Sequence, residues 1–256
     1  AQTSAAIVKA LIDKQIFEEY FIQEDRVNFE KNKVENEFSL SVAQQTAFDE
    51  IVKSFVEKDV TLLHGVTSSG KTEIYAKLIE NYIALGKQVL YLLPEIALTT
   101  QLVSRLTKHF GNKVAVFHSK YSNNERVEVW HQVLNSSDKA QVVIGARSSL
   151  FLPFNNLGLI IVDEEHEQTF KQQDPAPRYH ARDAAIVLAN FHNATRANPE
   201  ASGEPGGAKV LLGSATPSIE TYYNANSEKF GLVILKERFG KVPMPEIELV
   251  DLKDSY

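Results

Sequence analysis

The residues best suited to chemistry begin with a loop that fits a phosphate. Residues 65–72 read Gly-Val-Thr-Ser-Ser-Gly-Lys-Thr and match the P-loop pattern G-x-x-x-x-G-K-[ST]. Its glycines let successive backbone N–H groups point at phosphate oxygens, and the helix that should follow adds the positive end of its dipole. The lysine is expected to reach the β- and γ-phosphates. The predicted nucleotide contacts are Gly65, Thr67, Ser68, Ser69, Gly70, Lys71 and Thr72.

An acidic group after an apolar run supplies the expected partner of this loop. Residues 160–162 (Ile-Ile-Val) predict a buried strand, and residues 163–166 (Asp-Glu-Glu-His) follow it. In P-loop proteins the Thr72 hydroxyl and the Asp163 carboxylate would hold Mg²⁺, and Glu164 is placed to deprotonate the attacking water. Alone, the acidic group could be a solvated turn. Its position after a buried strand and downstream of a P-loop favours the catalytic interpretation.

Short apolar runs predict the strands that position these motifs. They are continuous rather than alternating, as a sheet with helices on both faces requires. The runs are residues 59–63, 88–93, 141–144, 157–162 and 209–212, with a weaker candidate at 114–117. Between them lie helical patterns such as residues 72–85, and Ser122 with Glu125 has capping-box spacing. The alternation predicts a doubly wound α/β domain whose mostly parallel sheet is sandwiched by helices, with ligands beyond the carboxyl ends of the strands.

Other stretches fall outside this α/β pattern. Residues 1–37 combine a helix-like segment with an alternating strand pair, which fits either the remnant of a winged-helix unit or an ordinary N-terminal extension. The ATP-binding lobe is expected to span residues 38–240, and residues 241–256 to begin a connection to a second lobe. Residues 195–208 are rich in Pro, Gly and polar residues and predict a surface loop. The single Met is Met244, so we expect a piece of a longer protein.

Composition excludes several classes of protein. The 256 residues contain no cysteine, which excludes disulfides and thiolate metal sites in the chain, and no His or carboxylate set has metal-ligand spacing, so no zinc is predicted. No run of about 18 apolar residues could cross a membrane, and the first residues lack the features of a secretion signal, so we expect a cytoplasmic protein. A net charge of −6 argues against coating nucleic acid through bulk charge but permits a local basic track.

Further motifs give the chain a resemblance to superfamily 2 helicases. D-E-x-H at residues 163–166 and S-A-T at residues 214–216 have the form of motifs II and III. Residues 170–173 and 178–183 are similar to the aromatic-rich loop of the primosomal replication-restart helicases, a loop that few other helicases carry. The remaining stretches that resemble this family are residues 62–67, 93–99, 144–151 and 212–218. The resemblance covers about residues 40–235 and implies the RecA-like first motor lobe of a DNA helicase.

The resemblance assigns roles to residues outside the phosphate site. Gln44, upstream of the first strand, is similar to the Q-motif residue that reads the adenine edge. His166 is similar to a catalytic-site residue that passes the state of the γ-phosphate to motif III, where Ser214 and Thr216 would receive it. Motifs Ia and Ib grip the DNA backbone in this family, and charge-assisted bonds from an arginine suit phosphate. The residues at these positions are Pro94, Glu95, Arg147 and Ser148.

The aromatic-rich loop mixes π-faces with cations, which suits stacking on single-strand bases and holding phosphates. Because it begins soon after the acidic motif, base contact there could move Glu164. The alternative is that Phe170 and Tyr179 pack against the sheet edge, since buried aromatics are common. The residues assigned to the DNA side are Phe170, Lys171, Arg178, Tyr179 and Arg182.

The motifs predict an ATP-hydrolysing site with ATP and Mg²⁺ as cofactors, and the family resemblance implies a 3′-to-5′ DNA helicase acting at stalled replication forks. The resemblance implies single-stranded and forked DNA, primosome proteins and single-strand binding protein as partners. It also implies a second lobe and a zinc module outside this chain, so the lobe alone should be inactive. Two alternatives stay open: another superfamily 2 translocase, such as an RNA helicase or a restriction-enzyme motor, and a non-catalytic fork-loading platform switched by ATP.

Overall fold

The computed structural model describes residues 14, 39–97, 100–118, 121–194 and 207–238. The predicted N-terminal extension and the predicted connection at residues 241–256 lie outside this part, apart from Lys14. Most of the predicted loop at residues 195–208 does so too. Within the described part, no helix is long and apolar enough to span a membrane.

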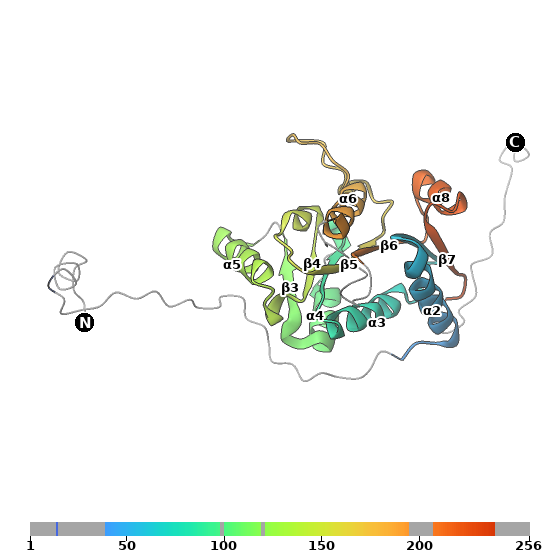
Figure 1. The fold of residues 1–256 in the computed structure, drawn as a ribbon, viewed down its shortest axis with the longest axis horizontal. Coiled ribbons are helices and arrows are strands. Elements are labelled where there is room, and N and C mark those ends of the chain that lie inside the picture. The colour runs from blue at the N-terminus through green and yellow to red at the C-terminus, as the bar shows by residue number, and fades with distance from the viewer. Residues whose placement is uncertain (1–13, 15–38, 98–99, 119–120, 195–206, 239–256) are drawn as a thin grey trace, which may run out of the picture.

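One parallel sheet organises the described residues (Figure 1). Its strand order is β3-β4-β2-β5-β6-β1-β7, and every neighbouring pair is parallel. The strands are β1 (Val60–Gly65), β2 (Gln88–Leu92), β3 (Val114–Phe117), β4 (Val142–Gly145), β5 (Leu157–Asp163), β6 (Lys209–Ser214) and β7 (Gly231–Leu235). The predicted fold class, an α/β lobe of the RecA type with a parallel sheet, is confirmed.

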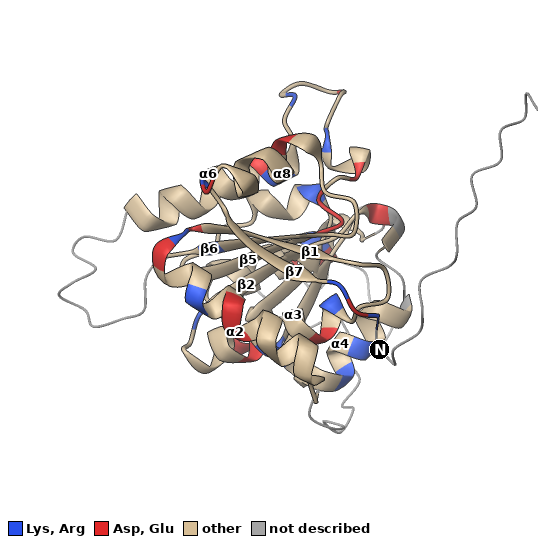
Figure 2. Cartoon of the chain, turned by 90° about the vertical axis from the view of Figure 1, so that its right-hand side faces the viewer, with Lys and Arg blue, Asp and Glu red and all other residues tan. Residues whose placement is uncertain are grey.

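Helices cover both faces of this sheet. α2 (Val42–Glu57), α3 (Lys71–Ala84) and α4 (Thr100–Phe110) pack on one face, and α5 (Asn123–Leu134), α6 (Ala181–Ala194) and α8 (Ile219–Asn226) pack on the other. Figure 2 shows α2, α3 and α4 on one side of the strands and α6 and α8 on the opposite side. The short 3₁₀ turns are η1 (Glu95–Ala97), η2 (Gly111–Lys113), η3 (Asp138–Ala140), η4 (Arg147–Phe151) and η5 (Gln168–Phe170).

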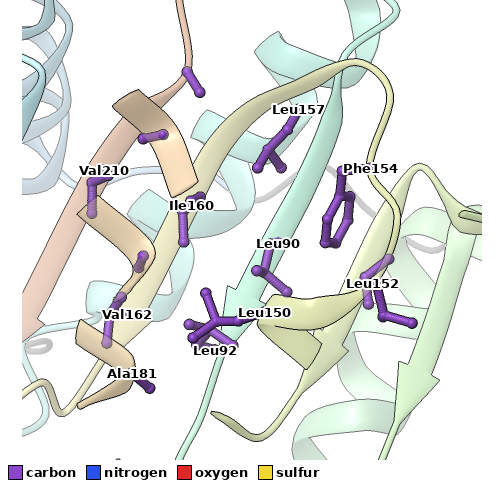
Figure 3. Packing of buried hydrophobic residues seen from close by; sticks show 14 of the residues in the cluster. Leu90, Leu92, Leu150, Leu152, Phe154, Leu157, Ile160, Val162, Ala181 and Val210 are labelled. Atoms are coloured by element: carbon purple, nitrogen blue, oxygen red, sulfur yellow. The ribbon is translucent and has the colours of Figure 1, made fainter. Parts of the chain in front are cut away.

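The central strands explain the continuous apolar runs of the sequence. Successive side chains of a strand point to opposite faces, so a strand covered on both faces needs an apolar residue at every position. Leu90, Ile160 and Val162 enter one core, in which Figure 3 shows Val162 beside Ala181 of α6 and Leu90 near Leu150. Their neighbour Ile161 enters the other core, beneath α3. Burial of these side chains stabilises the sheet that carries the site.

Because all the strands run in the same direction, their carboxyl ends meet at one edge of the sheet. The loop after β1 holds the P-loop, the loop after β5 holds the acidic group, and the loop after β6 holds the S-A-T sequence. β6 lies between β1 and β5, which brings these three loops together. The fold therefore gathers motifs that lie far apart in the sequence.

Candidate active site

The P-loop links β1 to α3, and Lys71 is the first residue of that helix. Gly70 has a φ of 82°, in the left-handed region that favours glycine, and a Cβ there would lie 2.0 Å from the Gln44 amide nitrogen. The loop borders a cavity of about 380 Å³ that it shares with the acidic group. The lining residues are Thr67, Ser68, Ser69, Gly70, Lys71, Thr72, Glu73, Arg105, Asp163 and Glu164.

Lys71 places a cation between the loop backbone and the acidic group. Its Nζ donates a hydrogen bond to the Gly65 carbonyl oxygen at 3.0 Å and lies 3.9 Å from Glu164 Oε1. Only 9% of the side chain is exposed, so little water screens this charge. The predicted phosphate-binding lysine therefore lies inside the cavity beside the predicted general base.

Two tyrosine hydroxyls hold the carboxylate of Asp163. Tyr75 donates to Oδ1 at 3.0 Å and Tyr91 donates to Oδ2 at 3.2 Å. Burial and the neighbouring Glu164 carboxylate raise the pKa of Asp163 to about 6, while the tyrosines and Lys71 act against this shift. The pKa values of both tyrosines are raised well above their usual value by burial and by Asp163, so both stay protonated donors.

These two tyrosines were missed in the sequence, although each left a signal. Tyr75 lies one helical turn after Lys71, on the face of α3 that the P-loop directs toward the sheet. Tyr91 carries a polar tip within the otherwise apolar residues 89–92 of β2. A Cβ at Gly213 would lie 1.8 Å from the Tyr75 hydroxyl, so the glycine of β6 makes room for this contact.

The residues around the cavity fit a magnesium nucleotide. The Asp163 carboxylate and the Thr72 hydroxyl offer the hard oxygen ligands that Mg²⁺ takes. Ser69 Oγ is buried and has no hydrogen-bond partner among the described residues, and it lies in the loop whose N–H groups would face a phosphate. Within the described part of the chain, no cluster of three or more His, Cys, Asp or Glu side chains could hold a metal ion.

Glu164 adopts a strained backbone at the end of β5. Its φ is 50°, in the left-handed region that residues with a Cβ rarely occupy. The carboxylate lies at the cavity, with 37% of the side chain exposed, and Oε2 is 3.6 Å from His166 Nδ1. The turn thus directs this candidate base back toward Lys71.

His166 joins the acidic group to the S-A-T sequence. Its Nδ1 is 2.8 Å from Ser214 Oγ, and its Nε2 is 3.4 Å from Thr216 Oγ1. The Thr216 amide also donates to Ser214 Oγ at 3.0 Å. The structure therefore brings together the residues for which a coupling role was predicted.

Gln44 contacts the P-loop directly. Its side-chain nitrogen donates to the carbonyl oxygens of Ser69 at 3.1 Å and Gly70 at 3.4 Å. Its side-chain oxygen accepts the Ser41 amide at 2.8 Å in the capping box of α2, and the residue is 1% exposed. The amide nitrogen thus braces the loop while the amide oxygen is held at the start of α2, and reading of adenine by Gln44 stays a prediction.

Glu73 and Arg105 were not singled out in the sequence. Arg105 of α4 forms an ion pair with Glu73 in the first turn of α3, and both border the phosphate cavity. No local pattern predicts this pair, because the arginine comes from a separate helix. The pair places a cation and an anion together at the rim of the cavity.

The structure corrects the expected role of Phe170. Only 1% of it is exposed, and it belongs to the core that contains Ala181 and Ala185 of α6. A base can stack only on an exposed ring face, so the packing alternative is right for this residue. Tyr179 is half-buried, and its ring meets the exposed ring of Phe151 edge to face at 5.2 Å.

Arg147 fastens the aromatic-rich loop. Its Nη1 donates to the carbonyl oxygens of Thr169 at 3.0 Å and Lys171 at 3.2 Å. The loop closes through a bridge between Lys171 and His180, and Gln172 N donates to Tyr179 O at 2.8 Å. A hydrogen bond to DNA phosphate from the same Nη1 would compete with these loop contacts.

The other residues assigned to the DNA side differ in exposure. Lys171 and Arg178 are exposed, and Arg178 Nε donates to Gln173 O at 2.8 Å. Glu95 is exposed, Ser148 is half-buried and Pro94 is buried. The assignment of Arg182 to the DNA side is wrong, because its side chain is only 11% exposed and pairs with the buried Glu165.

Comparison with known proteins agrees with the motifs. Residues 41–225 match the family model described as DEAD/DEAH box helicase. The chain is 40% identical over 257 residues to the Replication restart protein PriA of Bacillus subtilis (strain 168), covering 99% of this chain and 30% of that protein. It is 42% identical over 241 residues to the protein of the same name from Rickettsia felis, covering 92% of this chain and 35% of that protein. The chain thus spans about a third of the length of the curated relatives it matches, and the predicted family resemblance is confirmed.

Solved structures share the fold. RecG bound to a three-way DNA junction has a TM-score of 0.55 and 20% identity, covering 93% of this chain and 27% of that chain. The DUF1998 helicase MrfA bound to DNA has a TM-score of 0.53 and 18% identity, covering 78% of this chain and 26% of that chain. At these identities the likeness concerns the fold alone.

Proposed function

The chain belongs to the DEAD/DEAH box helicase family, and from this premise we propose that it is the ATP-binding first motor lobe of a DNA helicase of replication restart. The observation that carries the proposal is the meeting of Lys71, Asp163 and Glu164 at one cavity beside the P-loop. The similarity to proteins named PriA supports the restart role.

In this proposal the side chains divide the work of ATP hydrolysis. The P-loop amides and Ser69 hold the phosphates, and Lys71 stabilises the charge that develops on the γ-phosphoryl group. Thr72 and Asp163 hold Mg²⁺, which when bound neutralises charge on the phosphate oxygens. Glu164 accepts a proton from the attacking water.

The same contacts suggest how a change at the bound nucleotide is transmitted to the rest of the lobe. Glu164 lies 3.6 Å from His166, which contacts Ser214 and Thr216. A shift of the carboxylate would therefore reach the segment that leads to α8. Stepping along DNA also needs a second lobe, and an arginine finger from that lobe would complete the site.

The DNA surface of this proposal lies at the carboxyl edge of the sheet. Lys171 and Arg178 offer exposed cations, and Tyr179 offers a partly exposed ring. The 3′-to-5′ direction, the action at forks, the primosome proteins and single-strand binding protein as partners, and the cytoplasmic location belong to the proposal through the resemblance.

The test uses the full-length protein and the rate of ATP hydrolysis with no nucleic acid, with single-stranded DNA and with RNA. We expect strong stimulation by DNA and weak stimulation by RNA. The Lys71→Ala variant should lose turnover but keep single-strand binding. Equal stimulation by RNA would favour another superfamily 2 translocase. Near-wild-type turnover by Lys71→Ala would mean that the nucleotide site is assigned to the wrong residues.

A further inference from the structure

The carboxylate of Glu165 has no part in the reaction described above, yet it is the most completely bound acid of the acidic group. It is 0% exposed. Oε1 accepts the Ser218 amide at 2.7 Å, and Oε2 accepts Arg182 Nη1 at 3.1 Å and Thr221 Oγ1 at 2.9 Å. Ser218 Oγ also donates to Oε2 at 3.1 Å. Both oxygens of this buried charge are therefore hydrogen-bonded.

The partners of Glu165 come from two other segments of the lobe. Arg182 lies in the first turn of α6, two residues after His180, whose bridge to Lys171 closes the aromatic-rich loop. Ser218 caps the N-terminus of α8 and follows Thr216 by two residues. One carboxylate thus ties the catalytic turn to the exit of the aromatic-rich loop and to the start of α8.

The placement of Arg182 excludes two other roles for it. Its side chain is only 11% exposed, and its Nη1 also donates to Ser218 Oγ at 2.6 Å, so it is poorly placed to contact DNA. It is absent from the lining of the phosphate cavity, so it does not supply positive charge to the γ-phosphate. Its Nη1 bonds point to Glu165 and to α8, and its Nε pairs with the exposed Asp183 at 2.9 Å.

A buried ion pair resists separation, because an unpaired charge in the interior is costly. A movement of the aromatic-rich loop that shifts Arg182 must therefore carry Glu165 with it or break the pair. Glu165 directly follows Glu164, whose left-handed backbone positions the candidate base. The pair is thus a rigid connection between the loop and the base.

We propose that the Glu165–Arg182 pair, with Ser218, is a positioning element through which DNA bound at the aromatic-rich loop sets the placement of Glu164. This inference rests on the proposed DNA-stimulated ATP hydrolysis. Neither residue touches the nucleotide or the DNA. Their effect is on the maximal stimulation by DNA rather than on the affinity for either ligand.

The test compares three variants of the full-length protein: Arg182→Met, Glu165→Gln and the double variant. Arg182→Met leaves a buried carboxylate unpaired, so its melting temperature should fall. In the double variant no unpaired charge remains, and the Ser218 and Thr221 hydroxyls can accept from the new amide, so stability should largely return. Maximal DNA stimulation should stay reduced on the order of tenfold in all three variants, within the range of coupling between linked sites.

Two control variants and one conservative variant sharpen the result. Arg126→Met changes an exposed arginine of α5 that lies over the Phe117 ring, and it should leave both basal and stimulated rates unchanged. Arg178→Met changes an exposed cation of the aromatic-rich loop itself. It should raise the DNA concentration for half-maximal stimulation while keeping the maximal rate. Arg182→Lys, which keeps the charge, should recover part of the stimulation.

A double variant that is restored in stability but not in stimulation supports the inference. Return of stimulation together with stability overturns it, because the pair would then serve folding alone. Basal and stimulated rates that fall in the same proportion overturn it as well. A wild-type protein without DNA stimulation would instead overturn the proposed function, so the two failures are distinguishable.

Discussion

Replacement of Tyr91 by phenylalanine tests the way in which the site holds Asp163. The change removes the hydroxyl that donates to Asp163 Oδ2 at 3.2 Å and leaves the ring packed in β2. A hydrogen bond to a charged group contributes about 1.5–3 kcal/mol, and about 1.4 kcal/mol corresponds to one pKa unit. The pKa of Asp163, about 6 with both tyrosines present, should therefore rise to about 7 or above in the variant.

The expected consequence is a pH-dependent loss of magnesium binding. Mg²⁺ needs the ionised carboxylate, which predominates above the pKa and disappears as the pH falls through it. At pH 7 about a tenth of Asp163 is protonated before the change and about half or more after it. The Tyr91→Phe protein should need more Mg²⁺ for ATP hydrolysis at pH 6.5–7 and approach the wild type above about pH 8.5.

The assay is a magnesium titration of ATP hydrolysis by the full-length protein at several pH values. The matched control is Tyr82→Phe, which changes a half-buried tyrosine of α3 that borders a different cavity, between α2 and α3. It should follow the wild type at every pH. A magnesium requirement for Tyr91→Phe that is unchanged, or raised by the same factor at every pH, would refute the reasoning about the Asp163 carboxylate.

Three further changes follow from the same geometry. Gly213→Ala should displace the Tyr75 hydroxyl, because the added Cβ would lie 1.8 Å from it. In a magnesium titration this variant should behave like Tyr75→Phe. Wild-type behaviour would mean that the hydroxyl has another position. Shortening the loop within residues 172–178 should remove DNA stimulation and largely keep basal ATP hydrolysis, and equal losses of both rates would point to a folding role. Residues 1–256 alone should bind nucleotide weakly and hydrolyse it slowly, because the second lobe is absent. Robust DNA-stimulated turnover by this chain would contradict the need for an arginine from the second lobe.

Local patterns predicted the parts of the fold that depend on local forces. The continuous apolar runs of β2 and β5 were visible because both faces of these strands are covered. The capping box of Ser122 and Glu125 does begin α5, as its spacing predicts. β7 was missed, although residues 232–235 (Leu-Val-Ile-Leu) form an apolar run; it lies at the edge of the sheet beside β1, with Val233 and Leu235 buried and Ile234 exposed.

The candidate site likewise has parts that local patterns predict and parts that they do not. The P-loop and the acidic group carry their spacing in the sequence, so their meeting at one sheet edge followed from parallel strands. The position of Phe170 and the partner of Arg182 depend on contacts with segments that are distant in the chain. An aromatic ring and a cation in a polar loop resemble a DNA surface until the packing of α6 is known. Burial therefore decided between alternatives that the sequence left open.

The most direct test of the motor-lobe proposal is Glu164→Gln in the full-length protein. The change keeps the size of the side chain and removes the general base, so ATP affinity should stay near that of the wild type. ATP hydrolysis in the presence of single-stranded DNA should slow by about 10²–10⁴-fold, the usual contribution of a positioned general base. The measurement pairs equilibrium binding of ATP with single-turnover hydrolysis. Undiminished hydrolysis, or loss of ATP binding together with hydrolysis, would contradict the account.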